Sequence, residues 1–303
     1  MVSERHPTVD VVIVNWNGGY GVIAAARSAL RFGASVTVVD NASVDGSAER
    51  LIDEVPEARI ILLDHNAGFA VASNKGVAAG RGEYVFLLNP DAEIVLGATV
   101  DVATAFDHDP SVKIVGSKMV DSEDRAAPSV RQFPTLSALV LYQFKLRRWA
   151  RRITPLRRYL MVGFPAGEPA LVDQVMGASF IMRRSDWDRF GGMDERYFLW
   201  FEEVDLSRRI ALAGGRSLYW PSIVVRHVGG ASFAMLSRRT RQRIWNVSML
   251  TYAHRHLGRR AEVILRLTAP ASLVISTLLD VSSAVFRSLR RRQADADERP
   301  SLG

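Results

Sequence analysis

The sequence of 303 residues contains no cysteine. Disulfide bonds, thiolate metal ligands and cysteine nucleophiles are therefore excluded, and the absence fits a reducing compartment. The N-terminal segment before Thr8 has no apolar run, so we expect no secretory signal peptide there.

Two nucleotide-binding motifs are also missing. No Gly-x-Gly-x-x-Gly follows the first apolar run, Val9–Val14, and the chain has no Gly-Lys-Ser/Thr loop. These absences argue against a dinucleotide-dependent enzyme and against a P-loop NTPase.

Negative charge is missing from the centre of the chain. Residues 125–167 contain nine Lys or Arg and no Asp or Glu, and the whole chain has a formal net charge of +7. A chain this basic indicates an anionic partner, which is a nucleic acid, a membrane surface or a phosphorylated substrate. Composition alone does not choose among the three.

The first 120 residues alternate between apolar runs and helical stretches. We predict helices at about 20–31, 46–55, 69–79 and 97–107, and strands at Val9–Val14, Ser35–Val39, Arg59–Leu63, Glu83–Leu88 and Val112–Val115. This order predicts an α/β fold in which helices cover both faces of a mostly parallel sheet.

Polar residues follow four of these strands: Asn15-Trp16-Asn17, Asp40-Asn41, His65-Asn66 and Asn89-Pro90-Asp91. An ordinary turn would explain each one singly, because Asn and Asp are common turn residues. Sheets of this kind bind ligands beyond the carboxyl ends of their strands. Four polar turns at one edge therefore predict a ligand site.

Two acids at this edge have a defined chemistry. Mg²⁺ binds nucleotide phosphates together with one or two protein carboxylates, which Asp91, alone or with Glu93, would supply. Asp40, at the end of the second strand, would accept hydrogen bonds from a ribose or a base.

The second half contains an aromatic and acidic segment, Tyr197–Arg209, that includes Glu202, Glu203 and Asp205. A charged helix N-terminus is one interpretation. The other is that one carboxylate acts as a general base that takes a proton from an acceptor hydroxyl. Farther along, His227 ends an apolar strand and is either a structural residue or a ligand of metal or phosphate.

The basic central segment has a helical apolar stripe. The stripe predicts one amphipathic helix that ends at Pro155, formed by Leu139, Tyr142, Leu146, Trp149 and Ile153. Such a helix either lies on a membrane surface or packs on the core with a solvated basic rim.

A second amphipathic segment lies near the C-terminus. Val274, Leu278, Val281 and Val285 form one stripe, and Arg290, Arg291 and Arg292 follow it. Because Pro270, Asp280 and several serines interrupt it, we expect it to lie on a membrane surface rather than to cross the bilayer. We predict that residues 293–303 are disordered.

Taken in order, the motifs resemble those of the family-2 glycosyltransferases of the GT-A fold, and more narrowly the bacterial rhamnosyltransferases that build cell-wall linkers and polysaccharides. The motifs that carry the resemblance are Val11–Asn17, Val39–Ser47, Asn66–Ala70, Asn74-Lys75-Gly76, Asn89-Pro90-Asp91, Gly177-Ala178-Ser179, Phe190–Glu195, Phe201–Leu206 and His227.

The resemblance implies a domain organisation. A catalytic domain would span residues 1–235, with a nucleotide-sugar half at about 8–120, a basic amphipathic insertion at 125–168 and an acceptor half at about 170–235. Residues 236–292 would form a helical, membrane-associating region, and 293–303 a tail.

The resemblance also implies site roles. Asp91 and His227 would hold Mg²⁺ or Mn²⁺, and the base would be Glu203, with Glu202 and Asp205 beside it. The acceptor wall would comprise Gly177, Ala178, Ser179 and Trp200. The donor site would comprise Asn15, Asp40, Asn41, Asp45, Asn66, Gly68, Phe69, Asn74, Asn89 and Asp91.

Two positions depart from the family pattern. Asn89 replaces the Asp that begins the metal motif, which weakens one ligand. Glu203 replaces an Asp and is one methylene longer, so the base assignment stays open between it and its neighbours.

The implied reaction is an inverting transfer of L-rhamnose from dTDP-L-rhamnose to a lipid-linked or polysaccharide acceptor, at the cytoplasmic face of the plasma membrane. Galactofuranose, glucose or N-acetylglucosamine are alternative sugars, and a non-catalytic scaffold is an alternative role. A nucleic-acid partner is disfavoured, because carboxylates at the sheet edge repel phosphates unless a metal intervenes.

Overall fold

A computed structural model describes residues 7–228 and 235–297, with side chains described as far as Ser282. Its centre is a nine-stranded sheet with the order β3-β2-β1-β4-β10-β6-β11-β5, and β8 pairs with β11 outside this path. The strands are β1 (Val9–Asn15), β2 (Ser35–Asp40), β3 (Arg59–Leu62), β4 (Tyr84–Leu88), β5 (Ala92–Leu96), β6 (Val112–Val120), β8 (Ala170–Val172), β10 (Ser179–Arg183) and β11 (Arg216–His227).

The sheet is mostly parallel, as predicted. Strands β1 to β4, β6 and β11 run in one direction, whereas β5, β8 and β10 run in the other. A separate two-stranded sheet joins β7 (Val130–Arg131) to β9 (Gln174–Val175). The carboxyl ends of β1, β2 and β4 therefore meet at one edge, where the predicted donor residues lie.

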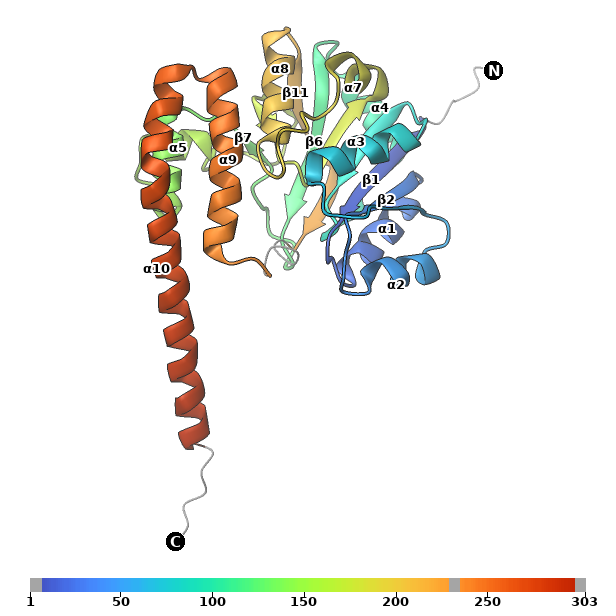
Figure 1. Cartoon of the computed structure of the whole chain (residues 1–303). Helices are drawn as coiled ribbons and strands as arrows, with labels where there is room; N and C mark the ends of the chain where they lie inside the picture. Colours follow the sequence, from blue (N-terminus) through green and yellow to red (C-terminus); the bar gives the residue numbers. More distant parts are fainter. Residues whose placement is uncertain (1–6, 229–234, 298–303) are drawn as a thin grey trace, which may run out of the picture.

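Helices cover both faces of the sheet (Figure 1). On one face lie α1 (Gly21–Arg31), α2 (Ser47–Glu54) and α4 (Thr99–Asp107). On the other face lie α3 (Phe69–Ala79), α7 (Arg184–Phe190) and α8 (Glu202–Leu212).

Strand β1 shows why its sequence is almost continuously apolar. Val11 and Ile13 belong to the core beneath α1, whereas Val12 belongs to the core beneath α3. Successive side chains of a strand point to opposite faces, and here both faces are buried. The strand therefore needs an apolar residue at nearly every position.

The basic insertion does not form the single predicted helix. It consists of α5 (Leu136–Gln143), a 3-10 helix η1 (Leu146–Trp149) and α6 (Thr154–Tyr159). The break falls at Lys145, which has a left-handed backbone with φ of 62° and whose ammonium donates to the side chain of Gln242. Tertiary contacts thus override the helical stripe.

Pro155 also has the opposite role from the one predicted. It lies in the first turn of α6 instead of ending a helix. Proline suits this position because the first N–H groups of a helix have no partner within the helix. Trp149, part of the predicted apolar stripe, is 41 % exposed.

Two long helices form the C-terminal region. Helix α9 (Arg238–His256) packs against α10 (Arg259–Asp297), whose far end projects beyond the rest of the chain (Figure 1). The Asp280 carboxylate accepts hydrogen bonds from the backbone N–H groups of Arg238 and Arg239 at 3.2 and 3.1 Å, so it caps the start of α9. The two helices are therefore antiparallel.

The inward side of α10 is apolar at Ala261, Leu265 and Ala269 and polar at Ser272 and Ser276, whereas an apolar stripe faces outward. Ser272 and Ser276 are completely buried, and Ser272 Oγ receives a 3.0 Å hydrogen bond from Asn246 of α9. The outward stripe, which is about half exposed or more, comprises Val263, Leu267, Val274, Leu278 and Val281. By length and composition, Arg259–Ser282 is sufficient to cross a membrane.

The helix continues to Asp297, so the prediction of disorder is wrong for residues 293–297. Residues 298–303 lie outside the described part of the chain, as do the side chains of Val285, Arg290, Arg291 and Arg292.

Candidate active site

The first two polar turns are held together by Asn15 and Asp40, which are both buried. Asn15 Nδ2 donates to Asp40 Oδ1 at 2.7 Å and to Ser47 Oγ at 2.8 Å. The second carboxylate oxygen of Asp40 accepts from the backbone N–H of Ser43 at 2.9 Å. The parallel pairing of β1 with β2 brings the two side chains level at the sheet edge, where they shape the predicted nucleoside site.

Asp45 and Asn74 also make contacts within the protein. The Asp45 carboxylate accepts from the Gly19 N–H at 2.9 Å. Burial raises the pKa of Asp45, but the hydrogen bonds that its carboxylate accepts outweigh this effect and lower the pKa. Asn74 joins α3 to the second half, because its Nδ2 donates to Met193 O and Glu195 Oε1 at 2.9 and 3.0 Å. Donor contact by these two residues stays a prediction.

A third turn connects the donor half to the acceptor half. Asn41 Nδ2 donates to Gly68 O at 3.2 Å, and Asn66 Oδ1 accepts from the Gly68 N–H at 3.0 Å. The N–H of Phe69 then donates to Phe198 O at 2.7 Å. Gly68 has a φ of +89°, and a Cβ atom there would lie 2.5 Å from Phe198 O. Only glycine therefore permits this contact.

The fourth turn brings Asp91 next to His227. Strand β5 begins directly after Asp91 and pairs with β11, with Ala92 opposite His227. Consequently His227 Nε2 lies 3.1 Å from Asp91 Oδ1, and Asn89 Nδ2 lies 3.5 Å from the same ring nitrogen. The side chains of Asp91 and His227 are 14 % and 22 % exposed, so both are open to a ligand.

These residues fit a divalent cation that also binds phosphate. Among the described residues, no group of three or more His, Cys, Asp or Glu side chains gathers at one point. A closed, all-protein metal cage is therefore absent from that part of the chain. Mg²⁺ at nucleotide sites takes one or two protein carboxylates and completes its shell with phosphate oxygens and water. Asp91 would supply one such carboxylate, and the His227 imidazole would add a nitrogen ligand beside it.

The candidate bases lie at the start of α8. Trp200 and Phe201, which precede it, both have left-handed backbones, with φ of 64° and 72°. Such strain in non-glycine residues concentrates at functional sites. Burial raises the pKa of Glu202 well above its usual value, with a contribution from the charge of Glu203, and burial also raises the pKa of Glu203.

Glu203 is the more accessible of the two. Glu202 is only 5 % exposed, whereas Glu203 is half-buried. One carboxylate oxygen of each, Oε2, has no hydrogen-bond partner among the described residues. A carboxylate with a raised pKa and a buried oxygen that has no partner in the described part of the chain is suited to accept a proton from a ligand that reaches it.

The acceptor wall joins this base to the metal turn. A Cβ atom at Gly177 would lie 3.4 Å from Glu203 Cγ, so the Glu203 side chain packs on the backbone there. The next residue, Ala178, accepts a 3.1 Å hydrogen bond from the N–H of Asn89. The predicted base and the predicted metal turn are thus linked through two adjacent residues.

The other two predicted acceptor residues lie differently. Ser179 is 1 % exposed, and its hydroxyl is 2.6 Å from that of Ser117, so its side chain belongs to the protein interior. Trp200 is partly buried and packs against an aromatic and aliphatic cluster that includes Phe201 and Tyr252.

Asp205 does not have the environment of a catalytic residue. It is fully buried, with Oδ2 2.7 Å from Arg209 Nε and Oδ1 2.7 Å from His256 Nε2. Burial raises its pKa, but the hydrogen bonds from His256 and Arg209 outweigh this effect and lower it. Asp205 therefore joins α8 to α9, and its burial argues against the predicted catalytic role.

Arg131 is a site residue that the sequence interpretation missed. It lies in β7, where its Nε is 3.2 Å from Met176 Sδ and its guanidinium stands over the Tyr159 ring at 5.5 Å. The positive charge of Arg131 opposes the rise in the pKa of Glu203. No local motif marks it, since its neighbours in the site are distant in sequence.

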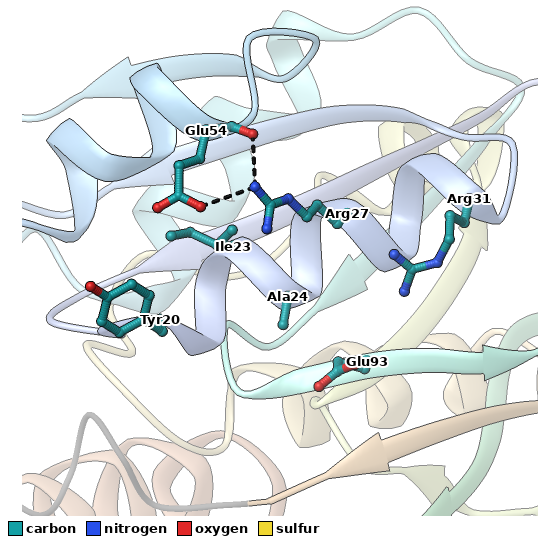
Figure 2. A pocket seen from close by; sticks show the side chains of 7 residues that line it. All are labelled: Tyr20, Ile23, Ala24, Arg27, Arg31, Glu54 and Glu93. Carbon is teal, nitrogen blue, oxygen red and sulfur yellow. Dashed lines mark hydrogen bonds and ion pairs between the residues drawn. The ribbon is translucent and has the colours of Figure 1, made fainter.

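A pocket lies beside α1 (Figure 2). Its volume is about 320 Å³, and Tyr20, Arg27 and Glu93 are among the residues that line it. Arg27 is paired with Glu54 at 3.0 Å. None of the predicted donor, acceptor, base or metal residues lines this pocket. Glu93, considered as a second metal carboxylate, lines this pocket together with Arg27 and Arg31, whereas Asp91 and His227 do not.

Known proteins are similar to this chain in sequence and in fold. The family model for "Glycosyltransferase like family 2" matches residues 6–245. An N-acetylglucosaminyl-diphospho-decaprenol L-rhamnosyltransferase of Mycobacterium tuberculosis is 30% identical over 272 residues, which cover 85% of this chain and 87% of that protein. Rhamnosyltransferase WbbL of Escherichia coli is 30% identical over 168 residues, which cover 54% of this chain and 59% of that protein.

Solved structures agree on the architecture. The mannosyltransferase PcManGT from Pyrobaculum calidifontis, in complex with GDP-Man and Mn²⁺, aligns with a TM-score of 0.53 at 19% identity and covers 98% of this chain and 82% of that one. GalNAc-T7 with UDP, GalNAc and Mn²⁺ aligns with a TM-score of 0.54 at 16% identity, over 84% of this chain and 51% of that one. The fold is GT-A, and the extent of the family match shows that this chain belongs to the family-2 glycosyltransferases.

Proposed function

We propose that this chain is an inverting, metal-dependent rhamnosyltransferase that moves L-rhamnose from dTDP-L-rhamnose to a lipid-linked N-acetylglucosaminyl diphosphate. The choice of sugar and acceptor is supported by the named activity of the mycobacterial relative. The observation that carries the mechanism is the link from Glu203 through Gly177 and Ala178 to Asn89. This link supports a proposal in which Glu203 is the base and the turn of Asn89-Pro90-Asp91 binds the cation on an adjoining element.

The donor diphosphate would bind at Asp91 and His227. A divalent cation held by these residues would neutralise the charge that develops on the departing nucleoside diphosphate. The nucleoside would lie against the turns built by Asn15 and Asp40, beyond the carboxyl ends of β1 and β2. The two structural neighbours were solved with Mn²⁺, which supports the use of a divalent cation.

Glu203 would remove the proton from the acceptor hydroxyl. Its raised pKa makes its carboxylate a stronger base than an exposed glutamate. The hydroxyl oxygen would then attack the anomeric carbon from the face opposite the leaving diphosphate. A single displacement inverts the configuration, so a β-L-rhamnosyl donor gives an α-L-rhamnoside.

The outward stripe of α10 would rest on the cytoplasmic face of the plasma membrane, with the enzyme bound peripherally. The stripe is apolar, whereas the opposite side of the helix is used for contacts such as that between Ser272 and Asn246. An acceptor that carries a prenyl chain resides in that membrane, which supports the same placement.

The test is a transfer assay with purified protein, dTDP-L-rhamnose and a lipid-linked N-acetylglucosaminyl diphosphate, followed by product mass. We expect Glu203→Gln and Asp91→Ala to abolish most turnover while circular dichroism stays unchanged. Full turnover by Glu203→Gln would refute the assignment of the base.

A donor with another sugar is the second candidate, because no contact in the described part of the chain identifies the sugar that the donor carries. Parallel assays with donors of galactofuranose, glucose and N-acetylglucosamine decide the matter. A donor other than dTDP-L-rhamnose with the higher kcat/KM would replace rhamnose in the proposal and leave the fold and the base unchanged.

A further inference from the structure

The basic insertion encloses a cavity that the proposed mechanism does not use. Its volume is about 490 Å³, and it lies between the segment that leads into β7, the η1 region and residues 160–166. Four arginines line it, Arg131, Arg147, Arg148 and Arg151. Apolar side chains, among them Met161 and Phe164, form another part of the wall.

The segment that contributes the cavity arginines contains no acidic residue. Residues 125–167 contain no Asp or Glu, and no ion pair of Arg147, Arg148 or Arg151 occurs within the described part of the chain. Like charges around one cavity repel each other, and an anion bound there would relieve this repulsion. The planar guanidinium group donates paired hydrogen bonds that match phosphate oxygens.

The cavity adjoins the wall that supports the base. Ser129, in its lining, accepts a 2.9 Å hydrogen bond from the N–H of Met176, and Arg131 contacts the sulfur of Met176. The residue after Met176 is Gly177, on which Glu203 packs. The end of the cavity that Ser129 and Arg131 line therefore adjoins the wall on which the Glu203 side chain packs.

We infer that this cavity binds the phosphate or diphosphate of the lipid-linked acceptor. Arg147, Arg148 and Arg151 would hold the phosphate oxygens, and the apolar wall would contact the first part of the lipid chain. The sugar attached to the diphosphate would then reach Glu203. The inference rests on the proposed function and adds to it a recognition site for the acceptor that is separate from the donor diphosphate site at Asp91.

The first experiment compares two triple variants of the full chain. In the cavity variant, Arg147, Arg148 and Arg151 are replaced by Gln. In the matched control, the exposed Arg152, Arg157 and Arg158, which lie in the same segment but do not line the cavity, are replaced by Gln. Both variants lose the same charge.

We expect the cavity variant to raise the KM for the lipid-linked diphosphate acceptor at least about tenfold, because each charge-assisted hydrogen bond contributes strongly to binding. The KM for the nucleotide sugar, and the KM for an alkyl N-acetylglucosaminide that lacks phosphate, should stay within twofold of wild type. The control variant should leave all three values unchanged. An equal rise of KM in both triple variants would overturn the inference, because it would show a general effect of charge.

A binding measurement separates this inference from the proposed function. Farnesyl diphosphate, which combines a diphosphate with a short prenyl chain, is titrated by calorimetry in the presence of EDTA, so that the donor site has no cation. Binding should persist in Asp91→Ala and in the control variant, and should weaken at least about tenfold in the cavity variant. If no acceptor supports transfer but this pattern holds, the proposed function fails and the cavity site stands.

Anionic lipid headgroups are the other source of phosphate. Sedimentation with vesicles of phosphatidylglycerol and with neutral vesicles distinguishes them from the acceptor. If the cavity variant loses vesicle binding, while its acceptor KM in neutral detergent and its affinity for farnesyl diphosphate equal those of wild type, the arginines bind the bilayer and the inference is refuted.

Discussion

Substitution of Asp205 by Ala separates a structural role from a catalytic one. The change leaves Arg209, whose side chain is 16 % exposed, and His256, which is 4 % exposed, without their buried carboxylate. Removing one partner of a buried ion pair costs about 3–5 kcal/mol. For a chain of this length, whose unfolding entropy follows the usual value per residue, that loss lowers Tm by about 5–8 °C.

Thermal unfolding followed by circular dichroism measures the effect, with Asp53→Asn on the exposed side of α2 as the control. Transfer activity assayed well below the lowered Tm should stay within about threefold of wild type. A double-mutant cycle of Asp205→Ala with Arg209→Ala should show that the two losses in the free energy of unfolding are not additive, because the two side chains share a hydrogen bond of 2.7 Å. An Asp205→Ala protein with an unchanged Tm and no activity would refute the structural role and restore the catalytic one.

The lowered pKa of Asp205 makes its contribution to the stability of the fold depend on pH, and the sign of that dependence follows from the direction of the shift. Its folded pKa lies below the value in the unfolded chain, so its ionised form stabilises the fold above the unfolded pKa of about 3.9. That contribution is lost as the pH falls through the lower, folded pKa. The gap in Tm between wild type and Asp205→Ala should therefore narrow in strong acid, and a gap that stays constant down to pH 2 would contradict the linkage.

Three further predictions concern the site. The rate of wild type should fall as the pH drops through the raised pKa of Glu203, and the acid limb of the kcat profile should disappear in Glu203→Gln; an acid limb that stays in place would assign it to another group. Asn89→Asp adds a carboxylate beside Asp91 and His227, so the Mn²⁺ concentration for half-maximal activity should fall severalfold, whereas an unchanged metal titration would place Asn89 outside the cation site. Gly68→Ala places a Cβ atom 2.5 Å from Phe198 O at a φ of +89°, and we expect a loss of at least about 2 kcal/mol in urea unfolding; a neutral effect would show that the turn can move.

The donor half could be predicted from the sequence because its signals are local. Strand β1 is an apolar run bounded by a polar turn, and its observed end at Asn15 differs by one residue from the prediction. Asp40 ends β2 and Asp91 lies three residues beyond the end of β4, so the parallel arrangement alone places them at one edge. The proximity of His227 to Asp91 required knowledge of β5, a five-residue strand that the sequence interpretation missed.

The features that could not be predicted from the sequence depend on contacts between segments that are distant in sequence. The break at Lys145 comes with a hydrogen bond to Gln242 on α9, which no pattern within residues 136–153 encodes. The interior position of Ser179 depends on the insertion of β10 between β4 and β6. Similarly, the sequence places Asp205 beside Glu202 and Glu203, but it gives no sign that His256 of α9, 51 residues away, is the partner of Asp205.

The polar contacts that Ser272 and Asp280 of α10 make with α9 affect how the chain would meet its acceptor. The cap that Asp280 provides and the contact between Ser272 and Asn246 prevent α10 from rotating about its own axis relative to α9. The outward stripe therefore keeps one fixed orientation relative to the candidate active site. On a bilayer, the chain would dock with a preset tilt and height, and its search for the proposed prenyl-linked acceptor would become a two-dimensional one in which every encounter presents the candidate active site in the same orientation.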